Sequence, residues 1–149
     1  MRPYEEFNIA LDLPHPTVPA VPSDEQVRFR LRFMAEEFIE TLRAALYAPR
    51  DLDAIETALA RVIDDGEIDV ELDAFVDGLA DQKAVIDGTY LYFGVDCRPI
   101  EAEVLRANMA KAGGPVRADG KRLKPPGWTP PEIRTELRLQ GWEQGWEEP

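Results

Sequence analysis

The chain has 149 residues, of which 44% are hydrophobic, and it carries a formal net charge of −12 at pH 7. This length suffices for one domain with a substantial core and is short for two. The excess of acids opposes binding to a nucleic-acid polymer, which calls for a basic surface. The single cysteine and the lack of a Cys/His cluster with zinc-ligand spacing indicate a reducing compartment. We see no signal peptide and no apolar run long enough to span a bilayer. We therefore expect a single cytoplasmic domain over residues 1–149 with no membrane partner.

The charge is distributed unevenly along the chain. From Arg106 to Lys124, six basic residues accompany one acid, which gives +5 over these 19 residues and leaves −17 on the other 130. An acidic body with one basic segment can hold a small polyanion if divalent cations bridge its carboxylates to the phosphates of the anion. The composition therefore favours a small phosphorylated ligand.

The N-terminal part predicts a short helix and then a long one. Residues 3–11 favour a short helix, and a proline-broken loop follows it. Ser23 or Asp24 suits the N-cap of a long helix over residues 24–48, which stops at Pro49.

Two further helices are predicted in the middle of the chain. Asp51 or Asp53 suits the cap of a shorter helix that ends at the turn of residues 64–66. A second long helix runs from about Ile68 to Gly94, a suitable C-terminal glycine. Its apolar residues are spread around nearly the whole circumference, which predicts a helix buried on most sides.

The C-terminal part predicts a fourth core helix and a basic loop. Pro99 suits the first turn of a helix that runs to about Ala112, and a last short helix is predicted over residues 131–140. Without any alternating strand pattern, the sequence predicts an all-α fold with a four-helix bundle core over residues 24–112. Residues 113–149 are expected to form a basic Gly/Pro-rich loop and tail.

Two pairs of carboxylates have the spacing of metal ligands. Glu37 and Glu40 lie about 60° apart around the first long helix, and Asp77 and Asp81 about 40° apart around the second. Aspartates on a buried helix require partners, either basic side chains or metal ions. Two antiparallel helices that each offer such a pair suit Mg²⁺ or Mn²⁺. Spacing alone also allows the alternative of a solvated acidic face.

These motifs resemble those of the MazG-like nucleotide pyrophosphohydrolases. The pattern Glu-Glu-x-x-Glu over residues 36–40 is followed on a later helix by Ala80-Asp81. The stretch RANMAKAGGPVRADGKRLKPPGWTPPEI, residues 106–133, looks very like the segment that ends the small viral and bacterial members. The resemblance runs from residue 27 to residue 133, with a gap in the alignment between residues 47 and 70. It implies an all-α enzyme in which a metal-activated water cuts a nucleoside triphosphate to monophosphate and pyrophosphate.

The resemblance also implies roles for the acids. Glu37 and Glu40 would bind the metal, Asp81 would match the aspartate of the second motif, and two or more Mg²⁺ or Mn²⁺ ions would be held per site. The family's usual Glu-x-x-Asp places a glutamate where this chain has Gly78. Asp77 is the replacement that its spacing from Asp81 allows.

A side chain that activates the water must come from the same acids. The only histidine, His15, lies in the proline-rich loop and is interpreted as structural or as a wall of the base pocket. Glu36 and Glu37 are therefore the candidates for the catalytic base.

The same resemblance implies contacts to the phosphates or the sugar from Asn108 and Lys111 on the predicted fourth helix and from Lys121 and Lys124 in the basic loop. We expect Arg117 to join them. The alternative is a solvated surface loop with Trp128 pinned in the core. Residues of the N-terminal segment are expected to wall the base pocket: Phe7, Asn8, Ile9 and Leu11.

The chain also resembles phage-encoded members of the superfamily, including those that convert dGTP to dGMP. That resemblance implies a purine deoxynucleotide as substrate, with dGTP first. A housekeeping enzyme of the same superfamily directed at dUTP or dCTP is one alternative. A non-catalytic helical module that binds metal or nucleotide is the other. The family further implies a homodimer or homotetramer.

Overall fold

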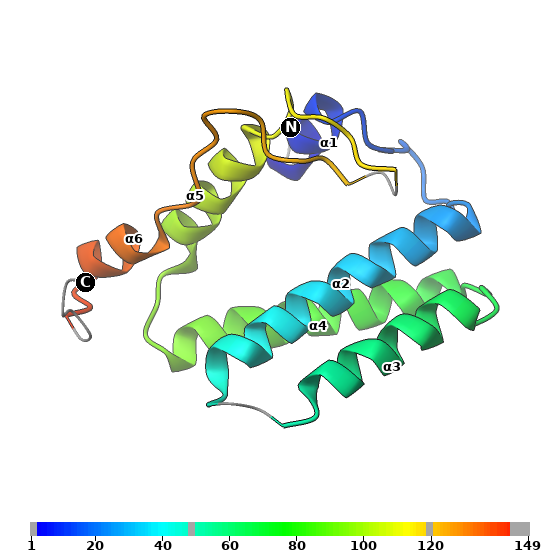
Figure 1. Ribbon diagram of the computed structural model, residues 1–149, viewed down its shortest axis with the longest axis horizontal. Helices are drawn as coiled ribbons and strands as arrows, with labels where there is room; N and C mark the ends of the chain where they lie inside the picture. The colour runs from blue at the N-terminus through cyan, green and yellow to red at the C-terminus, as the bar shows by residue number, and fades with distance from the viewer. Residues whose placement is uncertain (1–2, 48–49, 119–120, 144–149) are drawn as a thin grey trace. The chain divides into compact units, whose positions relative to one another are not determined.

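The computed structural model describes residues 3–47, 50–118 and 121–143, and this part of the chain is all-α. Its helices are α1 (Pro3–Ala10), α2 (Asp24–Ala45), α3 (Leu52–Asp65), α4 (Leu72–Tyr92), α5 (Cys97–Met109) and α6 (Ile133–Leu139), labelled in Figure 1. Extended pairing among the described residues amounts to one isolated antiparallel bridge between Val116 and Arg122. The predicted fold class is confirmed, whereas Pro49, the predicted stop of the first long helix, lies outside the described residues.

By internal packing, the chain divides into two compact units. One consists of residues 19–75, and the other of residues 1–18 together with residues 76–149. α4 begins in the first unit and continues in the second. The single domain and its four-helix core stay predictions.

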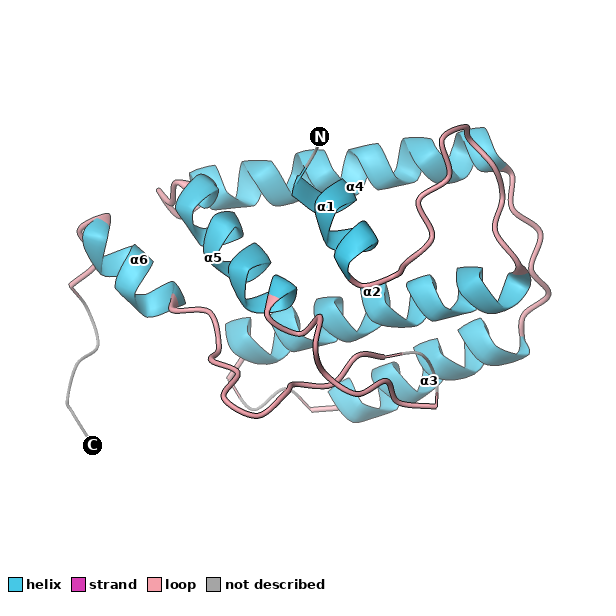
Figure 2. Cartoon of the chain, turned by 90° about the horizontal axis from the view of Figure 1, so that it is seen from above, coloured by secondary structure: helices cyan, strands magenta, loops and turns pink. Residues whose placement is uncertain are grey.

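The unit of residues 19–75 is built on a hairpin of α2 and α3, which run side by side (Figures 1 and 2). α2 begins at the predicted cap Ser23, whose hydroxyl accepts the backbone N–H of Gln26 while the Gln26 side chain accepts the N–H of Ser23. This capping box satisfies two donors that the first turn leaves open. α2 ends at Ala45, three residues earlier than predicted, because the chain turns extended at Leu46.

Arginines of α2 fasten the end of α3. The Arg28 guanidinium donates to the carbonyl oxygens of Ile63, Asp64 and Gly66, the last at 2.6 Å. These bonds satisfy carbonyls that a helix C-terminus leaves without partners. Arg32 adds an ion pair to Asp64 at 2.6 Å. Arg28 and Arg32 therefore attach α2 to the C-terminal end of α3.

The start of α3 differs in part from the prediction. Asp51 stands at the N-cap position, but its φ of 65° is left-handed and its side chain caps no N–H. Asp53 lies inside the helix and pairs with Arg43 at 2.8 Å. Asp51 therefore occupies one of the two predicted cap positions, but its side chain makes no capping hydrogen bond.

The other unit centres on α5, which packs against α1 and α6. Its buried core includes Leu11, Ile100 and Ala107. Asp96 caps α5 by accepting the N–H of Arg98, and the side-chain amide of Gln140 bonds both backbone groups of Asp96. These bonds fix the end of α6 against the start of α5.

α4 is far more exposed than its sequence predicts. None of its residues is buried, and apolar side chains such as Val85 and Leu91 are 69% and 78% exposed. The prediction of a helix buried on most sides is wrong for the single chain, because no helix of its own unit packs extensively along it. In the described part of the chain, no helix combines the length and apolar character needed to cross a bilayer.

Candidate functional site

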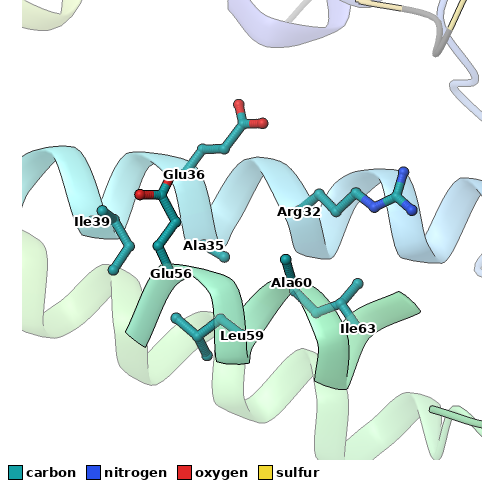
Figure 3. A pocket seen from close by; sticks show the side chains of 8 residues that line it. All are labelled: Arg32, Ala35, Glu36, Ile39, Glu56, Leu59, Ala60 and Ile63. Atoms are coloured by element: carbon teal, nitrogen blue, oxygen red, sulfur yellow. The ribbon is translucent and has the colours of Figure 1, made fainter. Parts of the chain in front are cut away.

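The three glutamates of α2 point to different surroundings. Glu37 and Glu40 are exposed, whereas Glu36 is half-buried. Glu36 lines a groove of about 140 Å³ between α2 and α3, and Figure 3 shows its side chain directed away from α3. Aliphatic groups and two further charged side chains complete the lining: Arg32, Ala35, Ile39, Glu56, Leu59, Ala60 and Ile63. Glu36 therefore differs from Glu37 and Glu40 in exposure, although all three lie on α2.

The second predicted pair lies on α4. Asp77 and Asp81 are both exposed, one helical turn apart. A Cβ built at Gly78 would meet nothing within 4 Å, so no close contact requires glycine there. Asp87 forms an ion pair with Lys83 at 2.8 Å, as a surface acid does.

The carboxylates have not been gathered into a metal centre within the described residues. No three side chains of the types His, Cys, Asp or Glu come together there in a way that could hold an ion. Glu37 and Glu40 belong to one unit, and Asp77 and Asp81 to the other. The donor chemistry fits a hard divalent cation, since Mg²⁺ and Mn²⁺ prefer carboxylate oxygens. The four-acid site stays a prediction.

Two of the five predicted phosphate contacts lie over one indole ring, and a third, Asn108, is bonded to one of them. Lys124 Nζ is 4.3 Å from the Trp128 ring centroid, and Lys111 Nζ is 5.7 Å from it. Lys111 also donates to the side-chain oxygen of Asn108 at 2.8 Å. Trp128 is half-buried, and its Nε1 donates to the Ala107 carbonyl at 2.7 Å. Trp128 thus anchors the loop to α5, and its ring contacts the ammonium groups of Lys111 and Lys124.

The other two predicted contacts lie on a turn. The backbone N–H of Arg117 donates to the Lys121 carbonyl at 2.8 Å, next to the bridge between Val116 and Arg122. The Arg117 side chain is exposed and that of Lys121 is half-buried.

Arg122 is a residue that the sequence analysis missed. Its guanidinium donates to the carbonyls of Ala112 and Gly114, at 3.2 and 3.1 Å, and to that of Leu11 at 3.2 Å. It therefore ties the basic loop both to the end of α5 and to the N-terminal segment. A Cβ at Gly114 would sit 1.9 Å from the Leu123 carbonyl oxygen, so this close approach requires glycine. The pair Gly113-Gly114 was the signal of that approach.

A second clamp holds the segment after the loop. Arg106 pairs with Glu103 at 2.7 Å and donates to the Pro130 carbonyl at 3.1 Å. The bonds from Arg106 and from the N–H of Glu132 lower the pKa of Glu103 to about 2. Arg106, one of the six cations of the basic segment, is therefore already paired within the chain.

The residues predicted to wall the base pocket have different surroundings in the structure. Leu11 is buried in the core, whereas Ile9 is exposed. Phe7 stacks edge-on against Tyr4, and the Asn8 amide donates to the Pro14 carbonyl. His15 approaches the carbonyl of Leu13 at 2.9 Å.

The arrangement is that of an all-α protein with acidic helices and a clamped basic loop. Over 93% of both chains, it matches a crystal structure from Exiguobacterium sp. 255-15, described as a "putative NTP pyrophosphohydrolase", with a TM-score of 0.69 and 26% sequence identity. No model of a known protein family matches the chain, and no curated protein matches it. The structural similarity supports, in coarse terms, the NTP pyrophosphohydrolase superfamily and a hydrolase that acts on nucleotides.

Proposed function

We propose that this chain is a metal-dependent nucleoside triphosphate pyrophosphohydrolase. The observation that carries the proposal is the similarity of nearly the whole chain to the Exiguobacterium protein. The spacing of the α2 and α4 acids and the cluster of Lys111 and Lys124 on Trp128 support it independently. The reaction converts a triphosphate to a monophosphate and pyrophosphate.

The acids are proposed to hold Mg²⁺ or Mn²⁺, two or more ions per site, through Glu37, Glu40, Asp77 and Asp81. When bound, such ions lower the pKa of a coordinated water and neutralise charge on the phosphate oxygens. Glu36 or Glu37 accepts the proton of the attacking water. The oxygen of that water forms a new bond to one of the two phosphorus atoms that flank the link between the α and β phosphates. That link breaks, and monophosphate and pyrophosphate are released. Glu36 is favoured for the proton, because it is not one of the four proposed ligands, whereas Glu37 is.

The leaving pyrophosphate is assigned to the basic loop. Lys111 and Lys124 offer ammonium donors, and Asn108, Arg117 and Lys121 are the further contacts proposed for the phosphates or sugar. Lysines in such a cluster act as point charges on phosphate oxygens. Their charge complements the acids, which engage the phosphates only through metal.

The proposed substrate is a purine deoxynucleotide, with dGTP first, and dUTP or dCTP is the alternative within the same reaction. The proposed assembly is a homodimer or homotetramer. The exposed apolar side chains of α4 support an assembly, because monomeric proteins rarely expose large apolar patches.

A nucleotide panel tests the proposal. The purified protein is incubated with each common ribo- and deoxynucleoside triphosphate and either Mg²⁺ or Mn²⁺, and the products are separated by anion exchange. Monophosphate and pyrophosphate are expected from one preferred base, and an Asp81→Ala variant should form neither. Turnover that survives in the variant would remove Asp81 from the site. No turnover of any nucleotide would contradict the enzymatic proposal and favour the non-catalytic binding module.

A further inference from the structure

Trp128 contacts two of the cations assigned to the phosphates. The ammonium groups of Lys124 and Lys111 lie 4.3 and 5.7 Å from its ring centroid. Both distances fall within the range in which an aromatic face attracts a cation. Lys124 precedes Trp128 in the basic loop, whereas Lys111 follows the end of α5. The ring therefore gathers charges from two separate segments.

Two ammonium groups near one another repel, and a lysine side chain is flexible. Lys111 is also held by its bond to the Asn108 side-chain oxygen at 2.8 Å, and the ring adds a contact that Lys111 shares with Lys124. The electron-rich ring face opposes the separation of the two ammonium groups. Ordering the ammoniums in advance lowers the entropic cost of binding an anion that uses both.

The ring itself is held in place by several bonds. Its Nε1 donates to the Ala107 carbonyl at 2.7 Å, and its backbone N–H donates to the Pro125 carbonyl at 3.1 Å. The next residue, Thr129, accepts a bond from Arg106 at 3.3 Å. A platform anchored in this way can set the position of flexible side chains that rest on it.

We propose that Trp128 is a positioning residue that holds Lys111 and Lys124 ready for the pyrophosphate part of the substrate. This inference rests on the proposed function, because it assumes that the lysines contact phosphate. Trp128 itself does not touch the reacting atoms. It acts through the electrostatics of its ring face, and this property can be changed without changing its shape.

Fluorinated tryptophans make that change. Ring fluorine withdraws electron density from the face while the indole keeps nearly the same outline and its N–H donor. The experiment uses a Trp142→Phe/Trp146→Phe background, in which Trp128 is the remaining tryptophan of the chain. This protein is produced with tryptophan, monofluorotryptophan or tetrafluorotryptophan. The dissociation constant of inorganic pyrophosphate is measured by calorimetry with Mg²⁺ present, and kcat and KM are measured with the preferred nucleotide.

Pyrophosphate affinity should fall stepwise with fluorine number, to about three- to fivefold weaker at the tetrafluoro form. KM should rise with it more than kcat falls. Circular dichroism should give nearly the same melting temperature for all forms, because packing and the Nε1 bond to Ala107 are kept and only the ring–lysine attraction weakens. A Lys111→Met/Lys124→Met background supplies the matched control, in which the dependence on fluorine should disappear.

Equal pyrophosphate affinity across the fluorine series would overturn the inference and leave the proposed function standing. Tighter binding on fluorination would also overturn it, since the ring would then compete with phosphate for the lysines. If the tryptophan form binds no pyrophosphate and turns over no nucleotide, the proposed function fails and the inference with it.

Discussion

The carboxylate of Asp81 lies exposed on α4, one turn after that of Asp77. Two negative charges at this spacing repel each other, and an ion bound by both removes the repulsion. Asp81→Ala should therefore leave the metal-free protein as stable as before, or slightly more so. It should also abolish the rise in melting temperature that Mg²⁺ or Mn²⁺ produces in the unsubstituted protein. Differential scanning fluorimetry with and without EDTA measures both effects.

Asp87→Asn is the matched control on the same helix. Asp87 pairs with Lys83 at 2.8 Å and is not a proposed ligand, so its metal-dependent stabilisation should match that of the unsubstituted protein. An undiminished metal response in Asp81→Ala would contradict the ligand assignment. A large stabilisation of that variant without metal would favour a plain acidic face.

Glu103 gives a prediction for pH. Its pKa in the folded protein is lowered to about 2 by Arg106 and by the N–H of Glu132, whereas the ordinary value is 4.5. A carboxylate with a lowered folded pKa stabilises the fold fully above its unfolded pKa and loses that contribution as the pH falls through the folded pKa. Stability should therefore decline between about pH 4.5 and 2 in part through this group.

The pH prediction is checked by urea unfolding at several pH values. Glu103→Gln should be less stable at pH 6 and should lose less stability on acidification than the unsubstituted protein. Glu101→Gln removes an acid from the same helix and serves as the control for a change of charge alone. Parallel pH profiles for Glu103→Gln and the unsubstituted protein would show that the ion pair contributes nothing to folding.

At the scale of an element, Gly78 is a glycine in the interior of α4. Glycine inside a helix costs about 0.5–1 kcal/mol relative to alanine, and no neighbour within 4 Å would meet an added Cβ. Gly78→Ala should therefore stabilise the fold by up to about 1 kcal/mol, as urea unfolding would measure. Gly78→Glu should stabilise the fold somewhat less than Gly78→Ala. Glutamate is a weaker helix former than alanine, and its charge is repelled by Asp77 and Asp81.

The same pair of variants separates helix propensity from metal binding. Gly78→Glu introduces the glutamate that the MazG-like motif Glu-x-x-Asp has at this position. This variant should therefore bind Mn²⁺ more tightly than Gly78→Ala in calorimetric titrations. Equal Mn²⁺ affinity in the two variants would mean that the side chain at position 78 does not reach the ion.

Helix boundaries could be predicted where a local signal decides them. Ser23 with Gln26 three residues later is such a signal, and the capping box forms. Asp51 carried the same kind of signal, yet its left-handed backbone leaves the cap unused. A propensity describes a residue type, whereas the entry of the chain into α3 depends on how α2 and α3 pack.

The burial of α4 shows a different limit of sequence reasoning. Apolar residues around the whole circumference predict burial but do not say by what. In the single chain they remain exposed. A pattern of this kind reports the assembled state of a protein as readily as the fold of one chain.

At the scale of the whole molecule, α4 is the surface on which assembly is expected. Leu79 and Ile86 lie seven residues apart on one stripe, about 140–200° round the helix from Asp77 and Asp81. Both are exposed, Ile86 by 55%. Ile86→Glu should therefore lower the molar mass measured by light scattering toward that of one chain, 16.8 kDa.

The control for assembly is an apolar side chain of similar exposure on another helix. Val62 on α3 is 70% exposed, and Val62→Glu should leave the molar mass unchanged. A single-chain mass for the unsubstituted protein would contradict the proposed oligomer, and so would an oligomer that both variants preserve.

The candidate site could be predicted in part. Asn108, Lys111 and Lys124 were singled out from residue type and resemblance, and the structure places the two lysines over Trp128 with Asn108 bonded to Lys111. Arg122 could not be separated from the other cations, because its role depends on carbonyls far along the chain, such as that of Leu11. The roles of the acids of α2 and α4 stay predictions, since spacing on one helix does not fix the distance to another.

The central claim is the bond that the protein breaks, and ³¹P NMR tests it most directly. Purified protein and Mg²⁺ are mixed with one nucleotide, dGTP first, and the spectrum is followed in time. The account predicts that pyrophosphate and monophosphate resonances rise together as those of the triphosphate fall, with no orthophosphate. Orthophosphate rising with a diphosphate would contradict it, because the bond broken would then be the one between the β and γ phosphates.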